Sequence, residues 1–127
     1  MFKKILLVIV GGGLGSACRY LLTLASSRAW GEHYAWGTLA VNLIGCLLIG
    51  FLFTLVEQQI ITPEIRLLLI TGFLGGFTTF SSFALESVTF FQNNNLSQSL
   101  LHLILNNFGG CALVLIGLWL GRFLFAK

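Results

Sequence analysis

The stretch from Thr71 to Glu86 combines residue types that an ordinary lipid-facing helix does not need. It reads TGFLGGFTTFSSFALE and lies in the middle of a hydrophobic run, yet it contains three glycines, four phenylalanines and a series of hydroxyl side chains. Polar side chains and non-helical backbone persist at membrane depth only where protein or a water-filled cavity covers them. The stretch therefore predicts the lining of a narrow polar path.

Phe80 and Phe83 are three residues apart, so they point the same way from a helix. Hydroxyls donate hydrogen bonds to an anion, and the edge of a phenyl ring is its electropositive part. This combination suits a small anion, because neutral donors replace lost hydration without trapping the ion. Plain packing is the alternative for an aromatic pair at this spacing. The hydroxyls around the pair belong to Thr78, Thr79, Ser81 and Ser82.

Further polar residues lie in the other hydrophobic stretches, where each is costly and therefore a functional candidate. Thr38 and Asn42 share one helix face, and His102 and Asn106 share another. Asn42 offers two amide donors. For both Asn42 and His102 the alternative role is a hydrogen bond that holds helices together. Arg19 is expected either to reach the membrane interface or to supply positive potential at the mouth of an anion path.

Four hydrophobic stretches are long enough to cross a bilayer, which takes about 20 residues each. They leave no room for a soluble domain, so we expect residues 1–127 to form a single four-helix transmembrane channel domain. The stretches run from about 5 to 24, 35 to 56, 65 to 91 and 100 to 125.

The third stretch is too long for a straight span. Paired glycines permit dihedral angles that a helix forbids, so we expect a break between Gly75 and Thr78; strong tilt is the alternative. Small residues four apart let helix backbones approach closely in lipid. That spacing occurs at Gly11/Gly15, Gly72/Gly76 and Gly117/Gly121.

Composition places the chain in a membrane. It is 57% hydrophobic and 9% charged, with a mean hydropathy of +0.95, whereas soluble domains average about 25% charged residues. The net charge of +3 is scattered, so no basic stripe is available for nucleic acid. The chain offers no nucleophile–base pair, metal-ligand cluster or phosphate loop, so we do not expect an enzyme. Cys18, Cys46 and Cys111 are expected to be small buried hydrophobes.

The basic residues lean to one side of the predicted bundle. With an even number of spans, the N-terminus, the connector 57–64 and the C-terminus share a side. The bias favours a cytoplasmic N-terminus. That side carries Lys3, Lys4, Arg66, Arg122 and Lys127, against Arg28 opposite, or Arg28 and Arg19 if Arg19 is counted there.

Three ordered segments resemble the signatures of the Fluc (CrcB-type) fluoride channels, and the resemblance covers essentially the whole chain. It implies a multi-pass channel of the bacterial inner membrane that lets fluoride leave the cell passively and so confers fluoride resistance. It also implies an all-α, antiparallel, dual-topology homodimer with a broken third helix and two pores along the subunit interface. The segments are GGGLGSACRY (11–20), GTLAVNLIG (37–45) and GFLGGFTTFSSF (72–83).

The resemblance also implies roles for individual residues. Asn42 would be the pore asparagine, and the ring edges of Phe80 and Phe83 would meet the ion. A structural sodium ion at the dimer centre would be held by backbone carbonyls of Gly75 and Thr78. Arg19 would belong to the vestibule, and the polar lining would comprise Thr38, Thr79, Ser81 and Ser82.

One departure from the family pattern concerns His102 and Asn106, which stand where many members carry tyrosine or asparagine and then serine. Both can donate hydrogen bonds, so a pore role survives. A titratable imidazole on the path would make conduction pH-dependent. The one-sided charge bias also leaves open a heterodimer with an oppositely biased paralogue.

Two rival functions remain open from the sequence. One is a small proton-coupled multidrug exporter of four-helix dimeric type, although the first stretch lacks the central carboxylate that such an exporter needs. The other is a scaffold in which these motifs only pack helices.

Overall fold

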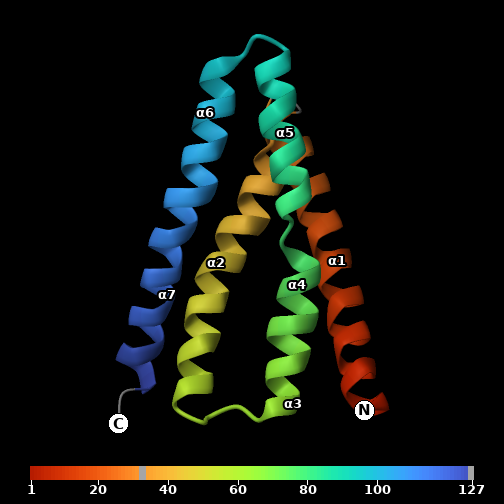
Figure 1. Cartoon of the computed structure of the whole chain (residues 1–127), viewed down its shortest axis with the longest axis vertical. Helices are drawn as coiled ribbons and strands as arrows, with labels where there is room; N and C mark the ends of the chain where they lie inside the picture. The colour runs from red at the N-terminus through yellow and green to blue at the C-terminus, as the bar shows by residue number, and fades with distance from the viewer. Residues whose placement is uncertain (32–33, 126–127) are drawn as a thin grey trace.

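The computed structural model describes residues 1–31 and 34–125, and all regular structure in this part is helical (Figure 1). Four rods are long and apolar enough to cross a membrane, which confirms the predicted four-span, all-helical class. The first rod is α1 (Phe2–Trp30) and the second is α2 (Trp36–Glu57). The third rod consists of α3 (Pro63–Arg66), η1 (Leu67–Leu74), α4 (Gly75–Phe77) and α5 (Phe80–Gln92), where η marks a π-helical segment. The fourth rod consists of α6 (Leu96–Ile104), η2 (Leu105–Gly109) and α7 (Gly110–Phe125).

The first and third rods begin and end beyond the predicted hydrophobic limits, whereas α2 begins one residue inside them and the fourth rod ends at the predicted residue 125. The first rod continues to Trp30 instead of stopping near Leu24. Polar side chains in its last turns end the hydrophobic stretch, but they do not interrupt the backbone hydrogen bonds of the helix. The third rod starts at Pro63, where Thr62 caps it by accepting a hydrogen bond from the Ile65 N–H at 3.3 Å. Proline suits this first position because its missing donor would be unpaired there anyway.

The start of α1, the connection from α2 to α3 and the end of α7 lie together at one end of the bundle (Figure 1). The opposite end carries the connection from α5 to α6. Arg122 and Glu57 form an exposed ion pair of 3.7 Å at the first end. The predicted clustering of basic side chains at this end is therefore consistent with the fold, and Lys127 lies outside the described residues. Which side of the membrane this end faces stays a prediction.

Glycines bring the rods close together in two places. A Cβ atom on Gly11 or Gly15 would collide with the backbone of η1 and α4, at Leu68 and Phe73 respectively. A Cβ atom on Gly50 or Gly117 would collide with the backbone of the facing helix in the α2–α7 pair. The predicted role of the small residues in close packing is confirmed.

The third rod is interrupted at Thr78 and Thr79. Both have extended backbone, with φ −86° and ψ 159° at Thr78 and φ −149° and ψ 115° at Thr79. The predicted break is confirmed, but its expected cause is wrong. Gly75 is helical, with φ −61° and ψ −34°, and Gly76 allows the carbonyl of Gly12 to approach. The glycines serve packing against α1, whereas the break uses dihedral angles that any residue can adopt.

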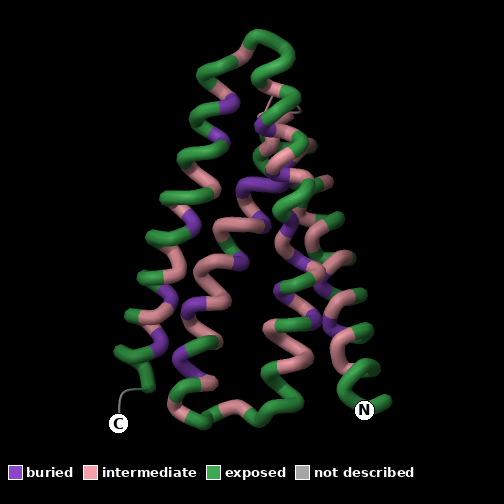
Figure 2. Tube along the Cα trace, viewed as in Figure 1, coloured by how far each residue is buried: buried purple, intermediate pink, exposed green. Residues whose placement is uncertain are grey.

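Many large apolar residues of the single subunit are exposed, and exposed residues recur along α1 and α7 in Figure 2. The buried core is small and centres on Val41, Leu74 and Phe77. Cys18 and Cys111 are exposed and Cys46 is half-buried, so the expectation of buried cysteines is wrong for the first two. Their outward apolar surroundings suit lipid or another protein chain.

Candidate functional site

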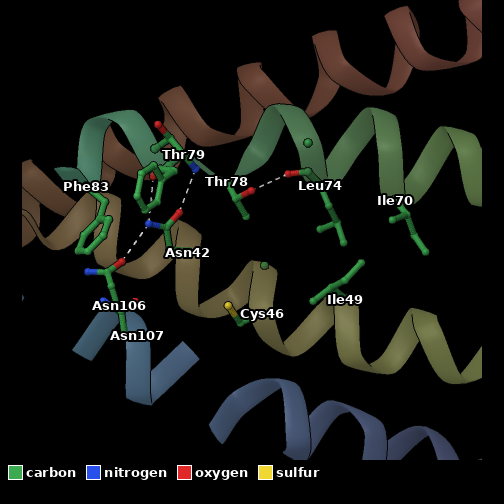
Figure 3. A pocket seen from close by; sticks show the side chains of 13 residues that line it. Asn42, Cys46, Ile49, Ile70, Leu74, Thr78, Thr79, Phe83, Asn106 and Asn107 are labelled. Carbon is green, nitrogen blue, oxygen red and sulfur yellow. Dashed lines mark hydrogen bonds between the residues drawn. The ribbon is translucent and has the colours of Figure 1, made fainter. Parts of the chain in front are cut away.

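Asn42 links three of the four rods at the level of the break (Figure 3). Its Nδ2 donates to the Thr79 carbonyl at 3.2 Å and to Asn106 Oδ1 at 2.9 Å. Its Oδ1 accepts from the Thr79 N–H at 2.9 Å. The carboxamide therefore supplies the partners that the backbone of Thr79 loses where the helix stops. The predicted alternative for Asn42, a hydrogen bond between helices, is present in the structure.

Thr79 is the N-cap of α5. Its Oγ1 accepts from the Ser82 N–H at 3.2 Å, as threonine commonly does at this position. The same hydroxyl donates to Ser82 Oγ at 3.0 Å, and Ser81 Oγ lies 3.4 Å away. Thr78 uses its hydroxyl to donate to the Leu74 carbonyl at 2.9 Å. The threonine hydroxyls thus stabilise the break, while the Ser82 hydroxyl hydrogen has no acceptor in the described part of the chain.

A groove of about 410 Å³ opens beside Asn42, between α2, the η1–α4 segment and the fourth rod. Its polar end holds Asn42, Thr79 and Asn106, and its other end is apolar, with Ile49 and Ile70 (Figure 3). The positive N-terminal end of the α5 dipole faces the polar end, because Thr79 and Phe80 line it. The remaining lining residues are Gly45, Cys46, Leu74, Gly75, Thr78, Phe83 and Asn107.

The two phenylalanines lie together but in different surroundings. Their ring centroids are 5.6 Å apart, with the planes tilted by 59°. Phe83 is 6% exposed, whereas Phe80 is 78% exposed on the outside of the subunit. Both line the groove. The predicted pair is therefore brought together, with the Phe80 ring left largely uncovered by its own subunit.

His102 and Thr38 lie outside this groove, in a second polar cluster. His102 is fully buried, and its Nε2 lies 3.2 Å from Glu86 Oε2. Thr38 Oγ1 donates to Glu86 Oε1 at 2.7 Å. The Tyr34 hydroxyl lies 3.3 Å from His102 Nδ1, and Asn106 Nδ2 donates to the His102 carbonyl at 3.0 Å. Asn106 thus connects this cluster to Asn42.

Glu86 and Tyr34 belong to this cluster although the sequence did not select them as site residues. A signal for Glu86 existed, since a carboxylate inside a span is a functional candidate. Tyr34 gave no such signal, because it belongs to a connector and is typical of an interfacial anchor. The pKa of Tyr34 is raised above its usual value, first by burial and second by the charge of Glu86.

Arg19 reaches the break from α1. Its Nη1 donates to the Thr78 carbonyl at 3.3 Å, so the guanidinium places positive charge at the break instead of extending to the membrane interface. The Gly75 carbonyl lies one turn earlier. Its ordinary helical donor, the Thr79 N–H, is directed to Asn42. Of the two carbonyls that the resemblance assigns to sodium, the structure thus places Arg19 on that of Thr78 and leaves that of Gly75 without its ordinary helical donor.

Comparison with known proteins gives a consistent family. The model described as "CrcB-like protein, Camphor Resistance (CrcB)" matches residues 6–118. The chain is 47% identical over 123 residues to the fluoride-specific ion channel FluC of Agrobacterium fabrum, covering 96% of this chain and 98% of that protein. It is 41% identical over 120 residues to FluC of Phocaeicola vulgatus, covering 94% and 99%. For FluC of Legionella pneumophila the identity is 42% over 119 residues, covering 93% and 89%.

Proposed function

The chain belongs to the CrcB/FluC family of fluoride-specific ion channels, and we propose that it conducts fluoride passively out of the cell through the groove beside Asn42. It is a four-span membrane protein and a channel, not an enzyme. The single observation that carries the proposed path is the helix break, where neutral hydrogen-bond donors meet an open groove. Family membership favours the channel over the proton-coupled exporter.

The proposed mechanism replaces the water around fluoride with fixed neutral donors. The N-terminal end of α5 contributes its dipole and the backbone N–H groups of its first turn. The Ser82 and Ser81 hydroxyls and the ring edges of Phe80 and Phe83 add further electropositive groups. Since these groups carry no net charge, they stabilise the ion without holding it permanently.

Asn42 acts in this proposal by shaping the break and by exchanging partners. Both of its amide hydrogens already have acceptors, the Thr79 carbonyl and Asn106 Oδ1. An ion that reaches Asn42 must therefore displace one of them. Asn106 is the easier one to displace, because a side chain can rotate whereas the Thr79 carbonyl is fixed in the backbone.

We propose that a second, antiparallel copy completes the path. The groove is open on the outside of the subunit, and Phe80 and Gly75 are exposed beside it. In a lone subunit this polar backbone would face hydrocarbon, which costs several kcal/mol for each unsatisfied group. A copy of the same chain, or alternatively a paralogue, would cover the groove and leave two paths at the interface.

A structural sodium ion forms part of the same proposal. The Gly75 carbonyl fits a hard cation, because the Thr79 N–H that would normally pair with it is directed to Asn42. The Thr78 carbonyl fits less well, since Arg19 donates to it. Two carbonyls from one subunit are too few to enclose a cation, so the site requires the second copy. When bound there, the ion would neutralise carbonyl dipoles at the break.

Fluoride-electrode recordings of efflux from proteoliposomes test the proposed function. We expect rapid fluoride release, no comparable chloride release, and a voltage produced by a fluoride gradient without a proton gradient. Transport that requires a proton gradient would instead support the exporter. Protein-free liposomes give the background leak.

Cysteine labelling from the two sides of sealed vesicles tests the antiparallel dimer. In a cysteine-depleted background, Asn93→Cys lies in the exposed connection after α5. Dual topology predicts that an impermeant reagent added outside labels about half of the sites. Complete labelling or complete protection would contradict it.

A further inference from the structure

A pair formed by His102 and Glu86 lies one layer behind the groove. His102 is 0% exposed, and its Nε2 lies 3.2 Å from Glu86 Oε2, whose side chain is 32% exposed. The two atoms are close but not aligned as a hydrogen bond, and neither has a hydrogen-bond partner among residues 1–31 and 34–125. A buried polar atom without a partner is costly, so charge attraction between the two groups is the interaction that this arrangement favours.

The pair is in contact with the proposed path on one side. The His102 ring lies 5.5 Å from the Phe83 ring, measured between centroids. Asn106, which bonds to Asn42 Nδ2, also donates to the His102 carbonyl. Phe83 and Asn106 both line the groove. The charge state of the pair is therefore felt where the ion would travel.

On its other side the pair borders a smaller cavity. This cavity of about 80 Å³ is lined by Glu86, Thr38, Tyr34, Ser27 and Thr23, among others, near the ends of α1 and α2. Thr38 lies one helical turn before Asn42 and holds Glu86 by a 2.7 Å hydrogen bond. Glu86 thus lines a small cavity that is distinct from the groove, while His102 contacts groove residues on the other side of the pair.

The number of protons on the pair sets the charge beside the path. With one proton shared between the two groups, their net charge is zero, whichever group holds it. When that proton leaves, the pair carries a net negative charge. Buried charges are screened far less than exposed ones, so this negative charge would repel an approaching anion.

We propose that His102 is a positioning residue that compensates the charge of Glu86, so that fluoride throughput is high with one proton on the pair, low without it, and lower at high pH than at low pH. The inference rests on the proposed fluoride conduction and adds a charge requirement that the neutral donors alone do not impose.

No other described side chain that faces His102 changes its charge between about pH 5.5 and about pH 8.5. Tyr34 faces it from the segment before α2, and the raised pKa of Tyr34 keeps its hydroxyl protonated. Phe83 and Phe90 face it from α5, and Asn106 lies on its own rod. Thr38 of α2 reaches it only through Glu86. These neighbours do not titrate, so Glu86 and His102 carry the expected pH dependence.

The test compares His102→Gln, Glu86→Gln and the double variant as full-length protein in proteoliposomes, from about pH 5.5 to about pH 8.5. We expect wild-type efflux to fall by at least about fivefold across this range. His102→Gln leaves Glu86 uncompensated and should be slow throughout. The double variant carries no charge and should recover most of the efflux with no dependence on pH. Glu86→Gln should not slow as the pH rises.

Ser99→Ala is the matched control. Ser99 is a buried polar residue on α6, as His102 is, but its hydroxyl carries no charge and donates to the Ser87 carbonyl. Its efflux should keep the wild-type pH profile. Size-exclusion elution verifies that each variant is folded.

Wild-type efflux that does not change with pH would overturn the inference even if no variant folds. A folded double variant that stays as slow as His102→Gln would also overturn it. If the wild type releases no fluoride at any pH, the proposed function fails first, which is a distinct outcome.

Discussion

The two halves of α2 use polar residues in opposite ways. In the half after Gly45, Gly50 lets α7 approach, and Thr54 is fully buried with its hydroxyl directed to the Gly50 and Leu118 carbonyls at 3.4 Å each. In the half before Gly45, Thr38 and Asn42 bond to Glu86, Thr79 and Asn106 on two other rods. The half after Gly45 packs against α7 through glycine and lines only the apolar part of the groove, through Cys46 and Ile49, whereas the half before it holds the polar end of the groove through Asn42.

The difference lies in what the polar groups satisfy. Thr54 bonds only to carbonyls of intact helices, which already have backbone donors. Asn42 bonds to a carbonyl and an N–H that the helix break has freed. Buried backbone groups need partners. Without the Asn42 side chain, the carbonyl and N–H of Thr79 would lose theirs, so the geometry of the helix break would change. This half is where we expect function, and the other half should affect only stability.

The largest effect should follow Asn42→Asp. A carboxylate cannot donate to the Thr79 carbonyl, and it adds negative charge beside the groove, so we expect fluoride efflux to fall by at least about 100-fold, equivalent to about 2.7 kcal/mol. Fluoride-electrode recordings measure the change. Asn93→Asp, which introduces the same charge in an exposed connection, should leave efflux unchanged. Normal efflux in the Asn42→Asp variant would remove Asn42 from the path.

A large effect of a different kind should follow Gly117→Ala. The added methyl group would meet the Leu47 carbonyl across the α2–α7 contact, so we expect a loss of stability of about 1–3 kcal/mol. Thermal unfolding in detergent measures this loss. Any protein that remains folded should still conduct.

Gly13→Ala is the matched control for Gly117→Ala, because nothing in the subunit lies within 4 Å of its added methyl group. Alanine favours a helix over glycine by about 1 kcal/mol, so this variant should be neutral or stabilised. A marked loss would instead indicate that a second copy covers this face of α1.

An intermediate effect should follow Thr79→Val. The side chain keeps its shape but loses the cap on α5 and the bond to Ser82. Loss of a helix cap costs about 1 kcal/mol, and we expect a several-fold fall in efflux because the break loses its geometry. Thr79→Ser retains the hydroxyl and should stay close to wild type. Equal activity of the valine and serine variants would refute a role for the cap.

The smallest effect should follow Thr54→Val. Its hydroxyl makes only two long bonds to carbonyls of intact helices, so stability should change by less than about 1 kcal/mol and efflux should not change. A fall in efflux comparable to that of Thr79→Val would erase the contrast between the two halves of α2.

Exchange of sodium in the buffer for a large organic cation tests the proposed ion site at the helix break without a change in sequence. We expect a lower thermal unfolding temperature if carbonyls at the break hold sodium, since a ligand that binds only the folded state stabilises it. An unfolding temperature that does not depend on sodium would contradict the proposed site.

Residue type and spacing by themselves determined the four spans, the close contacts at glycine and the interruption of the third rod. These features depend on local physics: apolar length against bilayer thickness, the absence of a Cβ atom, and polar groups too costly for lipid. The same physics selected Asn42, Phe80 and Phe83 as candidates without distinguishing their surroundings.

Only the tertiary structure decided which partners these residues take. The N–H of Thr79 bonds to Asn42, 37 residues away, and this contact accompanies a break at the threonines instead of the glycines. The tertiary structure also leaves Phe80 exposed and Phe83 buried. It places His102 against Glu86 instead of on the groove. The reason is that a group freed from its helix is satisfied by whichever side chain packing brings within reach, and spacing along one helix does not specify that partner.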